Sequence, residues 1–161
     1  MSWILGIFVF AIIMLLFILR AGKGPARSLE DLHKPIDELL KRGFDGGFLL
    51  INISYSKKFI QLRKYINSNN NFGIELVFPK AKWSLKFFDK IKSFCRDNNI
   101  HYLIRKEKAK HTLDFLYVDF GNDSKRAYDI VKRILLDVFE IKETTKLFLR
   151  LENASLEETL H

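Results

Sequence analysis

The side chains best suited to chemistry in this chain are carboxylates in residues 114–123. The triplet Asp119-Phe120-Gly121 matches the metal-binding triplet of protein kinases. A kinase also needs a Gly-rich phosphate loop, a strand lysine, and an Asp and an Asn in its catalytic loop. The sequence contains none of these motifs, so the triplet indicates a strand that ends and a glycine that turns the chain.

A magnesium site is the second possibility for these carboxylates. Asp114 and Asp119 are five residues apart, so in one strand they would point to opposite faces of the sheet. This leaves Asp119 and Asp123 as the only sensible pair. We expect instead a turn at Asp119 and a helix N-cap at Asp123. An enzyme that uses these two residues is kept only as an alternative.

Histidine and cysteine give no catalytic or metal-binding pattern. The single cysteine, Cys95, falls on the apolar side of a predicted helix, which is typical of an unreactive core thiol. The sequence has no GxSxG elbow, P-loop or GxGxxG motif. It therefore predicts a non-enzyme with no cofactor and no metal ligand. No HExxH motif or paired ligand spacing occurs among the four histidines, His33, His101, His111 and His161.

An unbroken apolar run extends from Trp3 to Leu19. As a helix it would be about 25 Å long, close to the bilayer hydrocarbon thickness of about 30 Å. Trp3 and Arg20 stand at its ends, where interfacial anchors are expected. The sequence predicts a transmembrane helix over residues 1–20 that contacts lipid through residues 3–19. The alternative is a signal peptide cleaved near residue 21 or 22.

The basic residues next to this run set its predicted orientation. Arg20, Lys23 and Arg27 follow the run, and no lysine or arginine precedes it. The positive-inside rule then places the N-terminus outside and the C-terminal domain in the cytoplasm. We therefore expect a single-pass protein of a bacterial inner (plasma) membrane.

The charge of the remaining chain limits the classes of molecule that it is expected to bind. The net charge is +8, and every charged side chain follows the apolar run. A basic surface held near a membrane attracts anionic lipid. No RNA-recognition signature, zinc-finger spacing or basic-region heptad accompanies the lysines and arginines. We expect contact between this basic face and anionic lipid, and no nucleic acid.

The elements that position these residues follow from periodicity. A linker at 21–27 leads into a globular domain at 28–152, and 153–161 form a tail. The expected class is α+β, in the order α-β-β-β-α-β-β-α, with an antiparallel sheet and helices on one face. The expected helices are 28–42, 83–97 and 124–138; the expected strands are 48–54, 58–67, 72–79, 100–105 and 113–120, with 146–152 as a possible last strand.

Residues 57–67 fit either a strand or a helix. We favour a strand, because the sequence NSNNN at 67–71 then forms a hairpin loop to the next strand. In a strand, Phe59, Gln61, Arg63 and Tyr65 lie on one face. Aromatic and arginine side chains are common at protein interfaces.

Four segments resemble a known group of domains: GGFLLINIS at 46–54, KFIQLRKY at 58–65, ELVFPKAKW at 75–83 and LYVDFGNDSKRA at 116–127. The amino-acid sequence and the order of elements over about residues 44–141 resemble the type III secretion chaperone-like fold, including TY-Chap and YbjN-like domains. The resemblance implies binding of a partner polypeptide through the sheet or a dimer face. The predicted anchor departs from the soluble secretion chaperones.

The predicted function is therefore a membrane-anchored, non-catalytic protein-binding module, an adaptor or chaperone-like protein with a partner that the sequence does not identify. The expected binding residues are Phe59, Gln61, Arg63, Tyr65 and Trp83. Two alternatives stay open. The first concerns these residues: Phe59 and Tyr65 could pack under a helix instead of binding a partner. The second concerns the function: the chain could be an immunity-type protein that neutralises a toxin at the membrane.

Overall fold

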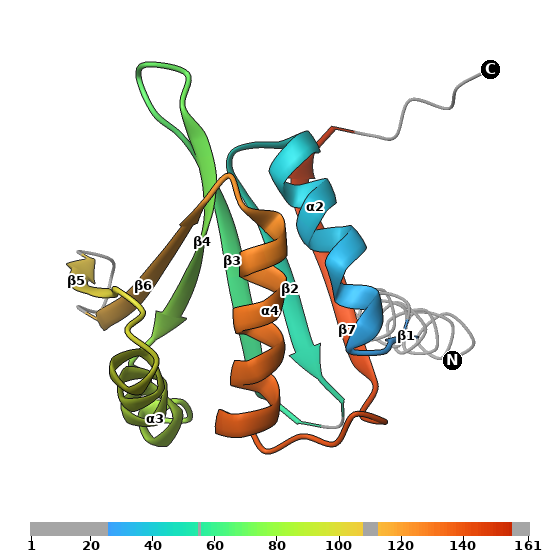
Figure 1. Cartoon of the computed structure of the whole chain (residues 1–161), viewed down its shortest axis with the longest axis vertical. Helices are drawn as coiled ribbons and strands as arrows, with labels where there is room; N and C mark the ends of the chain where they lie inside the picture. Colours follow the sequence, from blue (N-terminus) through green and yellow to red (C-terminus); the bar gives the residue numbers. More distant parts are fainter. Residues whose placement is uncertain (1–25, 55, 108–112, 156–161) are drawn as a thin grey trace, which may run out of the picture.

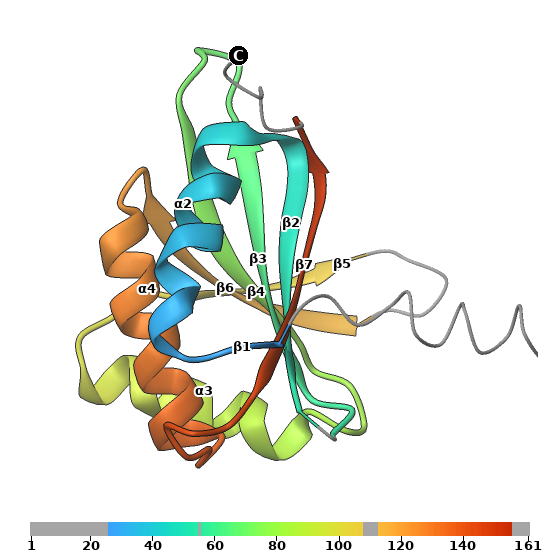
Figure 2. The ribbon, with the colours of Figure 1, turned by 90° about the vertical axis from the view of Figure 1, so that its right-hand side faces the viewer.

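Seven antiparallel strands form one sheet, and helices lie on only one of its faces (Figures 1 and 2). The computed structural model describes residues 26–54, 56–107 and 113–155. The strands lie in the order β1-β7-β2-β3-β4-β6-β5. Their bounds are Ala26–Arg27 (β1), Gly43–Ile53 (β2), Phe59–Ile66 (β3), Phe72–Pro79 (β4), Leu103–Glu107 (β5), Leu113–Gly121 (β6) and Leu147–Ala154 (β7).

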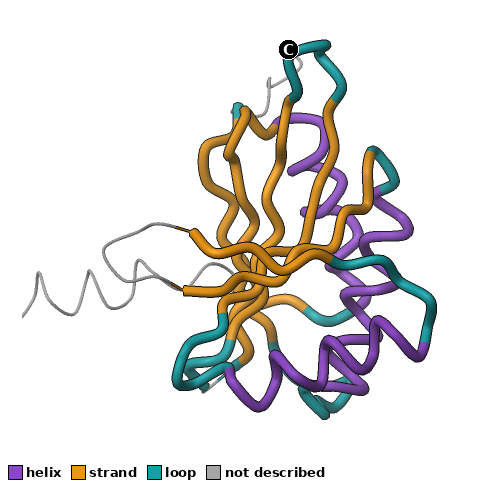
Figure 3. The backbone as a smooth tube through the Cα atoms, turned by 90° about the vertical axis from the view of Figure 1, so that its left-hand side faces the viewer, coloured by secondary structure: helices purple, strands orange, loops and turns teal. Residues whose placement is uncertain are grey.

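Among the described residues there are three α-helices, α2 (His33–Arg42), α3 (Leu85–Asp97) and α4 (Ser124–Arg133). A 3-10 turn, Glu30–Leu32, precedes α2, and a π-helical turn, Ile134–Val138, continues α4. The helices α2 and α4 pack on each other and on the sheet, while α3 packs against the π-helical turn. Figures 2 and 3 show β5 and β6 running across the direction of β2 and β7, so the sheet is strongly twisted.

The predicted α+β class is confirmed, and the elements from α2 to α4 follow the predicted order. The structure adds two strands to that order. The two residues of β1 fall within the predicted linker, and β7 extends to Ala154, past the predicted domain end at residue 152. The possible last strand is thus real, and it lies between β1 and β2. The strand expected at 100–105 begins later, at Leu103, and the helix expected from Trp83 begins at Leu85.

Pro35 is accommodated because it lies in the first turn of α2. A proline there removes an N–H that has no partner within the helix. The chain before α2 is held by Asp31, whose carboxylate accepts hydrogen bonds from Ser28 N at 3.0 Å and Ser28 Oγ at 2.8 Å. The helix expected from Ser28 is therefore a 3-10 turn followed by an α-helix, and neither has a side-chain N-cap.

Residues 59–66 form a strand, as predicted, with alternating burial. Ile60 and Leu62 are fully buried beneath the helices. Lys64 continues this inward row, and its ammonium donates a hydrogen bond to Leu40 O in the last turn of α2. Burial lowers the pKa of Lys64. The negative end of the helix dipole favours a cation at this place.

Aromatic rings fill the core where α3, β4 and the end of α4 meet. Phe87 and Phe139 stack with centroids 4.5 Å apart, and Phe78 meets Phe139 edge to face at 6.0 Å. Cys95 is fully buried beside them on α3, and burial raises the pKa of its thiol to about 11. Its predicted place on the apolar side of a helix is confirmed.

The predicted transmembrane helix, with its anchors Trp3 and Arg20, lies outside the described residues. Within the described ranges no helix is long and apolar enough to cross a membrane.

We predict that Cys95 will not react with a thiol reagent such as DTNB in the folded protein at pH 8. The thiol is buried, and its raised pKa of about 11 leaves almost no thiolate at that pH. Absorbance should show one equivalent of thiol only after urea is added. Full labelling within seconds in native buffer would contradict this burial.

Candidate functional site

The sheet face that α2 and α4 leave uncovered carries polar and aromatic side chains, such as Gln61, Arg63 and Tyr65 of β3. It faces away from the helices in Figure 2. The strand registers show which of its residues are neighbours on adjacent strands. One such row runs across β2, β3, β4 and β6 through Phe48, Arg63, Glu75 and Asp119. Many side chains of this face are half-buried rather than exposed, because the strongly twisted sheet folds toward itself on this side.

The structure places the predicted binding residues in two groups. Phe59, Gln61, Arg63 and Tyr65 are all half-buried residues of the uncovered face, because they alternate with the inward row of β3. Trp83 precedes α3 and packs on Phe59, with ring centroids 4.9 Å apart. Phe59 and Trp83 therefore form a tilted aromatic pair at one end of the sheet, away from Tyr65. Neither Phe59 nor Tyr65 lies under α2 or α4.

A groove of about 330 Å³ lies on this face, over β3, β4, β6 and β5. We call it the sheet groove. Its walls carry two arginines, two tyrosines, two carboxylates, a histidine, an asparagine and one exposed leucine. The lining residues are Arg63, Tyr65, Asn67, Glu75, His101, Leu103, Arg105, Tyr117 and Asp119.

Tyr117 forms the floor of the sheet groove, between two guanidinium groups. Its side chain is 3% exposed, and the Cζ atoms of Arg63 and Arg105 each lie 5.5 Å from its ring centroid. Arg63 also binds Glu75, with Nη2 2.6 Å and Nε 2.9 Å from the same carboxylate oxygen. Arg105 is exposed and makes no ion pair with any residue in the described part of the chain.

Tyr65 closes one end of the sheet groove by reaching over β4. Gly73 faces Tyr65 across the strand pair, and an added Cβ there would lie 2.4 Å from Tyr65 Oη. The missing side chain lets the phenol cross to β6, where its hydroxyl donates to Asp119 Oδ1 at 2.8 Å. Burial, followed by this hydrogen bond, raises the pKa of Tyr65 to about 12.

Asp119 and Asp123 both bind backbone groups at the β6–α4 turn. Asp119 Oδ1 also accepts a hydrogen bond from Gly121 N at 2.8 Å, and Gly121 has a φ of 59°. Asp123 caps α4 by accepting a hydrogen bond from Arg126 N at 2.9 Å. The predicted N-cap at Asp123 is confirmed. The turn expected at Asp119 comes later, because Asp119 still pairs with Glu75 and β6 continues to Gly121. In the part of the chain that the structure describes, no cluster of three or more His, Cys, Asp or Glu residues is arranged to hold a metal ion.

Sequence reasoning missed the far wall of the sheet groove. Arg105 and Tyr117 lie in predicted strands, yet nothing in the sequence shows that their strands pair in the register that sets Leu103 opposite Tyr117. The alternation of side chains along each strand could have placed Arg105 and Tyr117 on the outer face of the sheet. The sequence does not show that β6 pairs with β4, because α3 and β5 lie between them in the chain.

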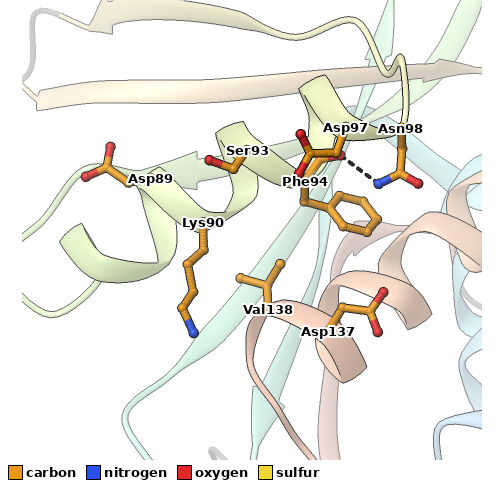
Figure 4. A pocket seen from close by; sticks show the side chains of 8 residues that line it. All are labelled: Asp89, Lys90, Ser93, Phe94, Asp97, Asn98, Asp137 and Val138. Atoms are coloured by element: carbon orange, nitrogen blue, oxygen red, sulfur yellow. Dashed lines mark hydrogen bonds between the residues drawn. The ribbon is translucent and has the colours of Figure 1, made fainter.

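A second hollow of about 400 Å³ lies between α3 and the π-helical turn (Figure 4). Three of its lining residues, Asp89, Asp97 and Asp137, are carboxylates. Asp89 lies 3.9 Å from Lys92 and Asp137 lies 4.0 Å from Arg133, so two of the three already have a basic neighbour. The dashed line in Figure 4 is the hydrogen bond from Asn98 Nδ2 to Phe94 O, which ends α3. We assign this hollow a structural role.

Comparison of the chain with protein-family models, curated proteins and solved structures gave no match.

We predict that Gly73→Ala will destabilise the fold by about 1–3 kcal/mol, the usual cost of overpacking. The added methyl group would lie within 3 Å of Tyr65 and of Gly121 O, so the phenol must leave Asp119. Urea unfolding should show this loss. In the Tyr65→Ala background the same change should cost less, because only the backbone contact is left. An equal cost in both backgrounds would contradict a role for the ring.

Proposed function

We propose that this chain is a single-pass membrane protein whose domain binds an extended segment of a partner polypeptide, without catalysis. The observation that carries the proposal is the sheet groove, in which Arg105 has no ion-pair partner among the described residues and lies over the buried ring of Tyr117. The apolar run Trp3–Leu19, with Trp3 and Arg20 at its ends, would hold the protein in the inner membrane. Its basic flank favours a cytoplasmic domain.

The chemistry of the sheet groove favours a polypeptide over a small metabolite. Pockets for small ligands are mostly apolar, with a few convergent polar groups. The sheet groove has mainly arginine, tyrosine and carboxylate walls. Arginine and tyrosine are the side chains enriched at the energetic centres of protein interfaces.

The position of β5 suggests how the segment would be held. β5 ends the sheet order, so its outer edge has no neighbouring strand among those described. An unpaired edge accepts an extended peptide by main-chain hydrogen bonding. Leu103 and Ile104 on this strand are 42% and 45% exposed, which is unusual for large apolar side chains of a sheet edge.

The charges of the sheet groove indicate what the partner segment carries. Glu75 neutralises Arg63 at 2.6 Å, whereas Arg105 keeps its charge uncompensated. Leu103 and Arg105 lie two residues apart on one face of β5, opposite Tyr117 and Phe115. A complementary segment therefore has an acidic side chain for Arg105 and an apolar one for Leu103.

The carboxylates that an enzyme would need have other partners here. Asp119 accepts hydrogen bonds from Tyr65 and Gly121, and Asp123 accepts one from Arg126 N. These contacts support a structural role for both residues. They favour a binding module over the alternative of an enzyme.

We predict that Arg105→Glu will abolish partner binding, because it places a carboxylate where the partner's acidic side chain would lie. The measurement is an affinity pull-down of the full-length chain from detergent-solubilised membranes, read by quantitative mass spectrometry. Lys125→Glu, an exposed change of the same charge on α4, is the matched control.

The expected result is a polypeptide recovered with wild type and Lys125→Glu and lost with Arg105→Glu. A lysine in place of the partner's acidic residue should then restore binding to Arg105→Glu. Equal recovery by all three proteins would overturn the sheet groove as the binding site. No recovered partner would overturn the protein-binding function, and a toxin as the partner would give the immunity-type role.

A further inference from the structure

We propose that the domain binds anionic lipid headgroups through five lysines at the end where the chain enters the sheet. We call them the entry lysines: Lys57, Lys58, Lys80, Lys82 and Lys86. This inference rests on the proposed membrane anchor and is independent of the sheet groove.

The strand registers place the entry lysines at the same end of the sheet as β1. Ala26 pairs with Phe148, which pairs with Asn52, which in turn pairs with Phe59. The ring of Trp83 packs on the ring of Phe59, with centroids 4.9 Å apart. Lys58 precedes Phe59 in the chain and Lys82 precedes Trp83. Both lysines therefore lie next to the row of paired residues that runs from Ala26 to Phe59. In Figures 1 and 2 this is the lower end, with α3 and the β2–β3 turn.

The entry lysines outnumber the carboxylates near them, which are Glu140 beside Lys58 and Lys86 and Asp114 in a hollow with Lys80 and Lys82. None of the five makes an ion pair with a residue that the structure describes, and all but the half-buried Lys58 are exposed. The segments 56–58 and 80–86 that carry them contain no Asp or Glu. Lys90, one turn further along α3, is by contrast paired with Glu140 at 3.0 Å.

The electrostatic effect of these lysines is visible at Glu140. Its pKa is lowered first by the hydrogen bond and charge of Lys90, and further by the charges of Lys86 and Lys58. Three ammonium groups from two separate elements thus act on one carboxylate. The opposite end of the sheet differs, because its β3–β4 loop at 67–71 has no charge and its β6–α4 turn carries Asp119 and Asp123.

Apolar groups accompany the lysines, as a lipid headgroup surface requires. Trp83 is half-buried and Leu85 is 49% exposed, and both lie between Lys82 and Lys86 in the chain. The ammonium of Lys58 lies 4.8 Å from the ring of Phe87, so its stem runs along apolar surface. Tryptophan and lysine side chains are favoured at the boundary between headgroups and hydrocarbon.

The short connection to the apolar run allows this end to lie against the bilayer. Only six residues separate Leu19 from Ala26. Even fully extended they reach at most about 25 Å. Because β1 is the first described strand, the end of the sheet that carries it is the end closest to the anchor along the chain. The potential of an anionic leaflet acts within about a Debye length, 8–10 Å. Lipid is therefore the occupant that the position favours over nucleic acid.

The test uses full-length protein in nanodiscs of phosphatidylcholine, with and without phosphatidylglycerol. Lysines are acetylated with an activated ester, and the rate at each site is read by mass spectrometry. We expect the entry lysines to react several-fold more slowly with phosphatidylglycerol present, and this difference to vanish at high salt. Lys41 in the last turn of α2 and Lys125 in the first turn of α4, which lie at the opposite end of the sheet, should react equally in both lipids.

A second measurement tests the charges directly. Trp3→Phe leaves Trp83 as the only tryptophan, so quenching by brominated phosphatidylglycerol reports contact at this end. Changing all five entry lysines to glutamine should remove the quenching. The control, glutamine at Lys41 and Lys125 at the opposite end of the sheet, should leave it unchanged.

The outcomes separate this inference from the proposed function. Equal acetylation in both lipids, in nanodiscs that contain the protein, would overturn lipid binding and leave the anchor and the sheet groove standing. Failure of the chain to enter nanodiscs would overturn the anchor and this inference with it, while the pull-down still tests the groove. Protection by an added oligonucleotide but not by phosphatidylglycerol would assign the lysines to nucleic acid and overturn the proposal.

Discussion

The one-sided cover of the sheet is the constraint on which the rest of the structure depends. Every strand must place an apolar row under the helices and a row that tolerates water on the other face. β3 shows this most simply, with Ile60 and Leu62 fully buried and Gln61 and Arg63 half-buried between them. A slip of one residue would exchange the two rows, so burial of the inner row fixes the register of the whole sheet. The uncovered face then receives, at fixed positions, the side chains that line the sheet groove.

The same constraint explains what the sequence predicts and what it does not. Alternation identifies β3 because its inward and outward rows differ in polarity along the chain. Lys64 breaks that pattern on the inner row, and only the structure shows that the end of α2 supplies Leu40 O as its partner. The two residues of β1 carry no periodicity, and their partners, Leu147 and Phe148, lie near the other end of the chain.

The sheet groove is less predictable than the fold because it depends on pairing between strands that are distant in the sequence. Arg63 is identified from β3 alone. Arg105 and Tyr117 become its neighbours only when β6 joins β4 and β5 joins β6. The absence of a side chain at Gly73, which opens the path from Tyr65 to Asp119, has no signature in a single sequence. The two proposed surfaces are also set apart by these pairings, since the sheet groove extends toward the β6–α4 turn and the entry lysines lie at the opposite end of the strands.

The position of β7 has a consequence for the order in which the domain is completed. β7 lies between β1 and β2, so the outer edge of β2 has no partner until residues 147–154 have been synthesised. Contacts between segments so far apart in sequence close late and slowly. A ribosome that stalls before residue 147 would release a sheet with an open apolar edge at Leu49 and Ile51, a target for aggregation and for quality-control proteases. The outer edge of β2 is therefore protected only once β7 has joined it.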